Sequence, residues 1–215
     1  MAMLHPTDIH THRKSDGSFR TIATAGIHPY DADSADSSTI ATIERMVGEI
    51  DAIGEIGLDG TCKSDIVQQE RVFRAQLAIA ERHKKAVVLH TVRRFEQTMK
   101  ILAEFELPQV IFHGFIGSKE QALRAISCGY YLSFGERTLC SPKTVEALRN
   151  VPLDRIFIES DVSDMPLEEI YEKLAALLGI ESDKLIKIVA ENFERLFPAN
   201  SASSAMTDAI SESKN

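Results

Sequence analysis

The chain has 215 residues, of which 44% are hydrophobic, so we expect one globular domain with a full-sized core. No apolar run reaches the roughly 20 residues that span a bilayer, and the N-terminal residues lack a secretory pattern, which predicts a cytoplasmic protein without membrane attachment. The formal net charge of −8 argues against a nucleic-acid partner unless basic residues gather at the site. Three widely spaced cysteines indicate neither a disulfide framework nor a thiolate zinc site.

Short apolar runs alternate along the chain with amphipathic stretches. The expected strands are Thr7–His10, Thr21–Ile27, Ala52–Ile56, Ala86–His90, Val110–His113, Tyr130–Phe134 and Ile156–Glu159. The expected helices are Ser38–Val47, Ile66–His83, Arg94–Phe105, Lys119–Cys128, Pro142–Arg149, Pro166–Leu178 and Ser182–Leu196. This alternation predicts an α/β fold of parallel strands joined by helical crossovers.

The composition changes near the C-terminus, where the sequence from Pro198 onward becomes small and polar. We therefore expect the folded domain to occupy residues 1–198 and residues 199–215 to form a flexible polar tail.

Side chains that bind metals stand at the C-terminal ends of most predicted strands. In "DIHTH", His10 and His12 occupy alternate positions and so share one face of an extended chain. The other candidates are Glu55, His90, His113 and Asp161. Taken singly, each is more often a cap or a structural hydrogen-bonding residue. Because the C-terminal ends of parallel barrel strands form one face, six such residues together indicate a site for one or two divalent ions.

Nine motifs carry a family resemblance, and they occur in order from Asp8 to Phe197. They are "DIHTH", "AGIHPY", "GEIGLDG", "QQERVFRAQLAIA", "VVLH", "FHGFIGS", "YYLSFG", "IFIESD" and "NFERLF". The chain resembles the TatD family of metal-dependent hydrolases, as a shortened member. The resemblance implies a distorted TIM-type (β/α) barrel and a TatD-like deoxyribonuclease that uses a metal-activated water.

The resemblance also implies a division of the six candidates within a dinuclear centre. His10, His12 and Asp161 would hold one ion, His90 and His113 the other, and Glu55 would bridge the two. Two such ions activate water and neutralise charge in the transition state, and Asp161 could then accept the proton of that water. The sequence leaves the choice among Mg, Mn and Zn open.

The chain departs from the family pattern in its connections. Only Arg13–Arg20 separates the first two predicted strands, which is too short for a helical crossover, so we expect an extended surface loop there and a barrel trimmed to about seven strands. The family's long loop after Asp161 is missing. The family's His-x-Arg element is also shifted, because Arg93 stands one residue late.

Basic residues follow the same strand ends as the candidate ligands. They are Arg13, Lys14, Lys63, Arg93, Arg94, Lys119 and Arg137. They read either as a solvated rim or as a cationic mouth that steers an anionic substrate. We expect Arg13, Arg93 and His28 to contact the substrate, which would be DNA or a small phosphodiester, and we infer no obligate protein partner. Asp59 either orients a ligand or caps a helix.

Two other functions are compatible with these residues. The same ligands could polarise the carbonyl group of a carboxyl ester, lactone or amide. The chain could also be a non-catalytic metal-binding scaffold. The basic rim favours the phosphodiester, and the presence of a competent residue at every ligand position favours an enzyme.

Overall fold

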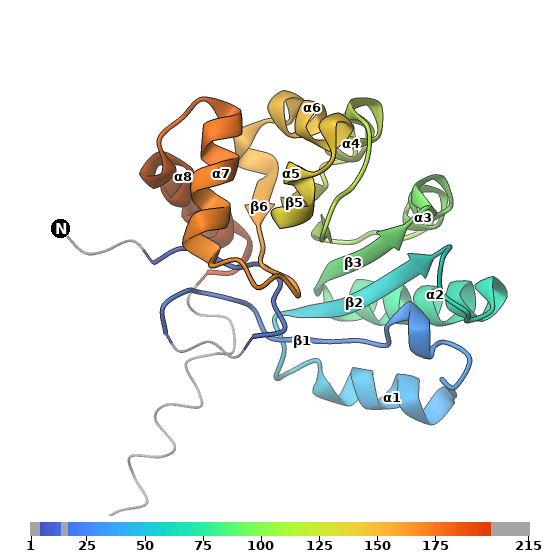
Figure 1. The fold of residues 1–215 in the computed structure, drawn as a ribbon. Helices are drawn as coiled ribbons and strands as arrows, with labels where there is room; N and C mark the ends of the chain where they lie inside the picture. The colour runs from blue at the N-terminus through green and yellow to red at the C-terminus, as the bar shows by residue number, and fades with distance from the viewer. Residues whose placement is uncertain (1–4, 14–16, 199–215) are drawn as a thin grey trace, which may run out of the picture.

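The computed structural model describes residues 5–13 and 17–198, so the expected tail, 199–215, lies outside the described residues. Six parallel strands form one sheet in the order β1-β2-β3-β4-β5-β6 (Figure 1). They are β1 (Thr24–Ala25), β2 (Ala52–Asp59), β3 (Ala86–Val92), β4 (Val110–Phe112), β5 (Tyr131–Phe134) and β6 (Ile156–Ile158). Each neighbouring pair is parallel and consecutive in the chain, as the sequence predicts.

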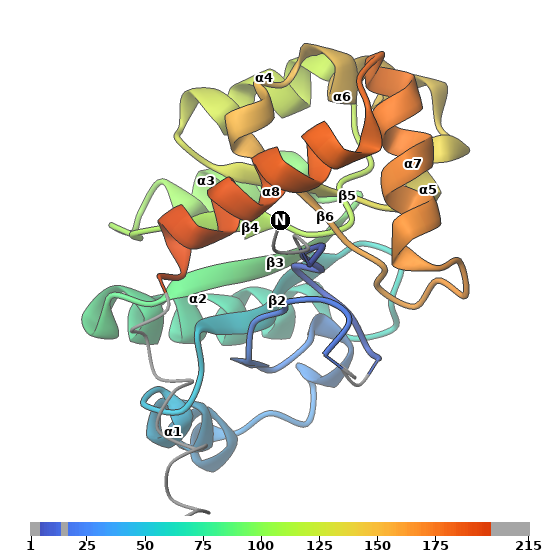
Figure 2. The ribbon, with the colours of Figure 1, turned by 90° about the vertical axis from the view of Figure 1, so that its left-hand side faces the viewer.

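Helices cover the outside of the sheet. They are α1 (Ser37–Met46), α2 (Ile66–His83), α3 (Phe95–Leu102), α4 (Lys119–Ser127), α5 (Glu136–Leu139), α6 (Pro142–Asn150), α7 (Leu167–Leu178) and α8 (Ser182–Leu196). Two short 3-10 turns, η1 (Pro29–Asp31) and η2 (Leu153–Arg155), complete the set among the described residues. Figure 2 shows α8 crossing the outside of β6, on the other side of the molecule from α1. None of the described helices is long and apolar enough to cross a membrane.

Most predicted helices agree with the observed ones to within a few residues, and α2 and α8 agree at both ends. Local signals explain the boundaries. Asp65 caps the start of α2 by accepting hydrogen bonds from two backbone N–H groups, and Ser118 and Gln121 form a reciprocal capping box at the start of α4. The sequence does not predict helix α5 or the 3-10 turns, because three or four residues are too few to show a helical spacing of apolar side chains.

The first predicted strand, Thr7–His10, is not assigned to the six-stranded sheet, yet it forms backbone hydrogen bonds on both sides. Asp8 N donates to Arg20 O at 2.8 Å, and Ile9 N donates to Ile158 O at 3.1 Å. Isolated parallel bridges join Thr7 to Arg20 and Thr11 to Asp161. The N-terminal segment therefore lies between β6 and the chain leading into β1, so the fold is a trimmed TIM-type barrel.

The connection Arg13–Arg20 is described only in part, because residues 14–16 lie outside the described residues. Its described part, Arg13 and residues 17–20, contains no helix, as expected. Strand β1 is shorter than the predicted Thr21–Ile27, and β2 continues past the predicted end at Ile56 to Asp59.

An irregularity in β2 places Glu55 at the centre of the sheet's C-terminal side. The pairing of β2 with β3 shifts register between Ile53 and Ile56, which frees Glu55 from the regular alternation. Gly57 follows with φ of +143°, and a Cβ there would stand 2.1 Å from the carbonyl oxygen of His90. Only glycine fits this close approach of two strands.

Two buried glutamines of α2 fasten the ends of β1 and β2. The side chain of Gln76 accepts a hydrogen bond from Ile27 N at 2.6 Å and donates one to Ile27 O at 3.1 Å. Gln69 does the same with Asp59, accepting from its N–H at 2.8 Å and donating to its carbonyl at 3.2 Å. Each side-chain amide pairs with both the backbone N–H and the backbone carbonyl of one residue, and so fixes the residues that follow.

We predict that Gln76→Leu lowers the free energy of unfolding by about 2 to 4 kcal/mol, because it leaves the backbone N–H and the backbone carbonyl of Ile27 buried and unpaired. Urea denaturation followed by circular dichroism measures the change. Gln68→Leu, on the partly exposed side of the same helix, is the control and should change stability by much less. Equal stability of the two variants would contradict this role of Gln76.

Candidate metal centre

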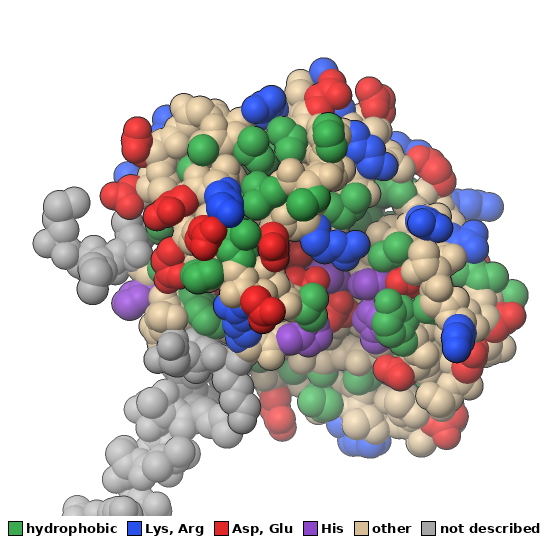
Figure 3. All heavy atoms as spheres, in the orientation of Figure 1, with side chains coloured by type: hydrophobic (Ala, Val, Ile, Leu, Met, Phe, Trp, Pro, Cys, Tyr) green, Lys and Arg blue, Asp and Glu red, His purple; other side chains and the backbone are tan. Residues whose placement is uncertain are grey.

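The six predicted ligands converge at the C-terminal ends of the strands. His10 and His12 come from the N-terminal segment, Glu55 from β2, His90 from β3, His113 from the residue after β4, and Asp161 from the chain after β6. In the space-filling view, histidine side chains gather in a hollow at the centre of one face, with basic side chains beside it (Figure 3). The Glu55 carboxylate lies in the middle of the cluster.

One oxygen of Glu55 faces the N-terminal histidines. Glu55 Oε1 lies 3.0 Å from His10 Nε2 and 3.5 Å from His12 Nε2. Asp161 Oδ1 is 3.8 Å from His10 Nε2 and 3.6 Å from His12 Nε2. His10, His12 and Glu55 therefore form one candidate metal-binding group, and Asp161 joins His10 and His113 in another.

The other oxygen of Glu55 faces a second set of imidazoles. Glu55 Oε2 lies 2.7 Å from His113 Nε2, 3.6 Å from His90 Nδ1 and 3.9 Å from His28 Nε2. The His28 ring also packs on His90, with 4.4 Å between ring centroids. The sequence predicts His28 as a substrate contact, and the structure places it close enough to form a metal-binding group with Glu55 and His90.

The donor atoms fit divalent ions. Metal–ligand bonds of about 2.1 Å place two ligands of one ion about 3 to 3.5 Å apart, and most separations on both sides of Glu55 are close to this range. His10 Nε2 is buried and has no hydrogen-bond partner among the described residues, as expected for an atom whose lone pair faces a cation. The mixture of imidazole and carboxylate suits zinc, manganese or magnesium.

The charges around Glu55 favour its ionised form. Burial alone would raise the pKa of Glu55, but the close imidazoles of His10, His113 and His90 outweigh burial and hold the pKa well below its usual range. Burial and the neighbouring His90 lower the pKa of His28, which keeps this imidazole neutral and able to donate a lone pair. The cluster thus combines a fixed anion with imidazoles that surround it.

His113 has carboxylates on both of its nitrogens. Its Nε2 faces Glu55, and its Nδ1 lies 3.6 Å from Oε1 of Glu159, which is 2% exposed. Burial lowers the pKa of His113, but the charges of Glu159 and Glu55 outweigh burial and raise this pKa to about 10. A divalent ion must therefore displace a proton from His113 in order to bind.

Buried carboxylates behind the histidines orient them. Asp59 Oδ2 accepts a hydrogen bond from His90 Nε2 at 2.9 Å, which leaves Nδ1 of that ring as the lone-pair donor toward Glu55. The Asp59 carboxylate thus orients the His90 ring. Asp8 accepts hydrogen bonds from the backbone and hydroxyl of Ser160, at 2.9 and 2.6 Å, and so fixes the chain before Asp161.

The sequence motifs assign no role to Asp8 or Glu159, although both residues stand in the motifs that contain the candidate ligands. The signal was present in their positions, since each is an acidic residue within a short predicted strand, Asp8 in Thr7–His10 and Glu159 at the end of Ile156–Glu159. Such a residue must be paired when it is buried, and the histidines and Ser160 supply that pairing.

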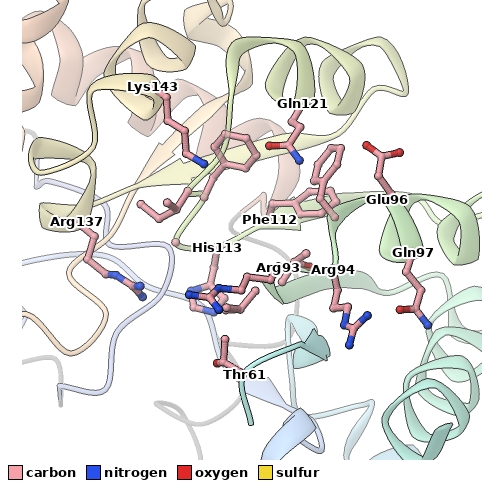
Figure 4. Close-up of a pocket in the computed structure, with 16 residues that line it drawn as sticks. Thr61, Arg93, Arg94, Glu96, Gln97, Phe112, His113, Gln121, Arg137 and Lys143 are labelled. Carbon is pink, nitrogen blue, oxygen red and sulfur yellow. The ribbon is translucent and has the colours of Figure 1, made fainter. Parts of the chain in front are cut away.

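The predicted substrate contacts separate in the structure. Arg93 lines a cavity of about 680 Å³ that also includes His113 (Figure 4). The Arg13 guanidinium instead donates a hydrogen bond to the carbonyl oxygen of Ser163, and Arg13 does not line this cavity. A smaller cavity of about 330 Å³ lies beside Asp161 and Ser163.

A parallel α/β barrel with histidines and carboxylates at the C-terminal strand ends defines the class of metal-dependent barrel hydrolases. Residues 5–198 match the model of the family described as "TatD related DNase". The chain therefore belongs to the TatD family, and it is a hydrolase of that family, as the sequence motifs indicated.

Individual relatives agree with this assignment. The chain is 30% identical over 198 residues to an uncharacterized metal-dependent hydrolase, YabD, of Bacillus subtilis, an alignment that covers 83% of this chain and 78% of YabD. It is 29% identical over 201 residues to the 3'-5' ssDNA/RNA exonuclease TatD of Dickeya dadantii, covering 81% of this chain and 76% of that protein.

A solved structure supports the fold. The crystal structure of YjjV, a TatD homologue from Escherichia coli, superposes with a TM-score of 0.76 at 25% sequence identity, covering 82% of this chain and 76% of that one. The trimmed barrel is thus a shorter version of a known architecture.

We predict that divalent-metal affinity rises with pH below about pH 10. The raised pKa of His113 means that the metal-free protein holds a proton there, and this proton leaves when an ion binds. Titration calorimetry with zinc in buffers of different ionisation enthalpy counts the protons released. The expected result is the release of at least one proton per protein molecule that binds zinc at neutral pH. Zero release would contradict the protonation of His113.

We also predict that Asp59→Asn lowers metal affinity by about 10- to 100-fold. The amide N–H₂ would donate to His90 Nε2 and force the ring proton onto Nδ1, where it faces Glu55 and blocks the lone pair. Metal titration of both proteins measures the change. Asp36→Asn, at the exposed N-cap of α1, is the control and should leave metal affinity unchanged.

Proposed function

We propose that this chain is a phosphodiesterase that cleaves DNA with two divalent ions, Mg, Mn or Zn, held on either side of Glu55. One observation carries the proposal. The two oxygens of Glu55 face separate sets of imidazoles, with His10 and His12 beside Oε1 and the pair His90 and His113 beside Oε2. Asp161 lies next to His10 and His12.

The chain's own residues divide the work of the reaction. When bound, the ions would supply Lewis acidity toward phosphoryl oxygens and a nucleophilic water at neutral pH. Glu55 would place a negative charge between two such cations and so reduce their mutual repulsion. Asp161 acts as the base, since its carboxylate is next to the cluster and its side chain, 20% exposed, can be reached by water.

Residues around the cluster favour a phosphodiester over a carbonyl compound. Arg93 lies beside His113 in the cavity and can bind a phosphate oxygen through paired N–H groups. Relatives named as an exonuclease and as a putative deoxyribonuclease also favour a phosphodiester substrate. Two other functions remain as alternatives. The chain could hydrolyse a carboxyl ester, lactone or amide, or it could be a metal-binding scaffold without activity.

We predict that Glu55→Gln abolishes phosphodiester hydrolysis while the barrel stays folded. A neutral amide cannot hold two cations together, so at least one ion should be lost, together with several kcal/mol of transition-state stabilisation. The fold should survive because the buried apolar strands hold the barrel, not the residues at its mouth. Metal content by mass spectrometry, circular dichroism and an assay on DNA and bis(p-nitrophenyl) phosphate measure these effects.

Glu172→Gln on the exposed side of α7 is the matched control and should keep both metal and activity. The assay should include Mg, Mn and Zn, with and without chelator, and a panel of carboxyl esters. A parent protein that cleaves esters but no phosphodiester would overturn the proposal, and so would a Glu55→Gln variant with the parent's rate.

A further inference from the structure

The 680 Å³ cavity extends away from the metal cluster, and four basic residues line it. Arg93 and Arg94 come from the β3–α3 connection, Arg137 from α5 and Lys143 from α6. Figure 4 shows Arg93, Arg137 and Lys143 reaching into the space around His113 from these different elements. Because His113 belongs both to the cavity wall and to the metal cluster, the two sites are continuous.

Some basic side chains elsewhere on the surface are neutralised by carboxylates. Arg74, Arg82 and Arg124 each form ion pairs with glutamates. Within the part of the chain that the structure describes, none of the four cavity residues forms an ion pair with a carboxylate. Arg94 Nε, moreover, is buried without a hydrogen-bond partner. These four cations outnumber Glu96, the carboxylate in the cavity lining, which itself pairs with Arg124. The excess of positive charge favours the binding of an anion.

The cavity also has an apolar side and room for more than a phosphate group. Phe115 and Ile116 contribute to the wall, and Ile116 is 39% exposed. A volume of about 680 Å³ is typical of pockets that enclose a molecule the size of a nucleotide. Apolar side chains next to cations suit a base or sugar that is attached to a phosphate.

We propose that this cavity is a subsite for the nucleotide next to the cleaved bond, with Arg93, Arg137 and Lys143 binding its phosphate. This inference rests on the proposed function, because it takes the metal cluster as the place of cleavage. The preferred substrate is then a strand with at least two consecutive phosphates. An isolated phosphodiester fills the metal site alone and leaves these cations without a partner.

Binding without hydrolysis tests the subsite directly. The probe is a short phosphorothioate oligothymidylate with a fluorescent label, measured by anisotropy in the presence of chelator. The double variant Arg137→Ala/Lys143→Ala should bind it about tenfold or more weakly. The slope of log affinity against log salt should fall by about 0.7, the value for one lost phosphate contact on a single strand.

A matched double variant separates the subsite from general charge. Lys184→Ala/Lys187→Ala removes the same charge from the exposed side of α8 and should keep both the parent's affinity and its salt slope. Arg137 and Lys143 are exposed, so the cavity variant should fold, which circular dichroism checks. Lys143→Glu alone is the second variant and should weaken binding through charge repulsion.

Activity gives an independent readout. The ratio of kcat/KM on the oligonucleotide to kcat/KM on bis(p-nitrophenyl) phosphate should fall about tenfold in the cavity variant. An unchanged ratio, unchanged binding, or equal competition by a glutamate peptide of the same charge would overturn the subsite. If the parent cleaves no phosphodiester with any metal, the proposed function fails, and the binding measurement still decides whether the cavity holds a nucleotide strand.

Discussion

The structure of the site depends on one buried anion, Glu55, which is surrounded by imidazoles from separate strands. Burial disfavours a carboxylate, and the surrounding histidines more than offset that cost, as the lowered pKa of Glu55 shows. Each imidazole in turn depends on the position of its strand end. The arrangement therefore requires that the N-terminal segment, β2, β3, β4 and β6 all reach the same face of the barrel.

A second layer of carboxylates explains how these imidazoles stay in place. Asp59 bonds to His90, Glu159 lies beside His113, and Asp8 fixes the chain at Ser160. Beneath them the side chains are apolar and almost completely buried. From the core outward, buried carboxylates contact imidazoles, and these imidazoles contact the central carboxylate of Glu55. Each of these contacts offsets part of the free-energy cost of burying a charged group.

The overall acidity of the chain gives a poor guide to its partner. The net charge of −8 is a sum over the whole sequence, whereas a substrate meets the potential at the mouth of the site. Away from the site, several arginines are neutralised by glutamates on neighbouring elements. The basic residues of the cavity have no such partners among the described residues, and they outnumber the acidic side chains of its lining.

The sequence by itself determined the helices, the order of parallel strands and the convergence of the six candidate ligands, because these follow from periodicity and from the geometry of parallel strand ends. Tertiary structure decided how the N-terminal segment closes the barrel, that His28 approaches Glu55, and that Lys143 joins Arg93 across a cavity. Local spacing cannot encode these contacts. They depend on how far each loop extends over the C-terminal face of the barrel. Only the packing of the whole chain determines that distance.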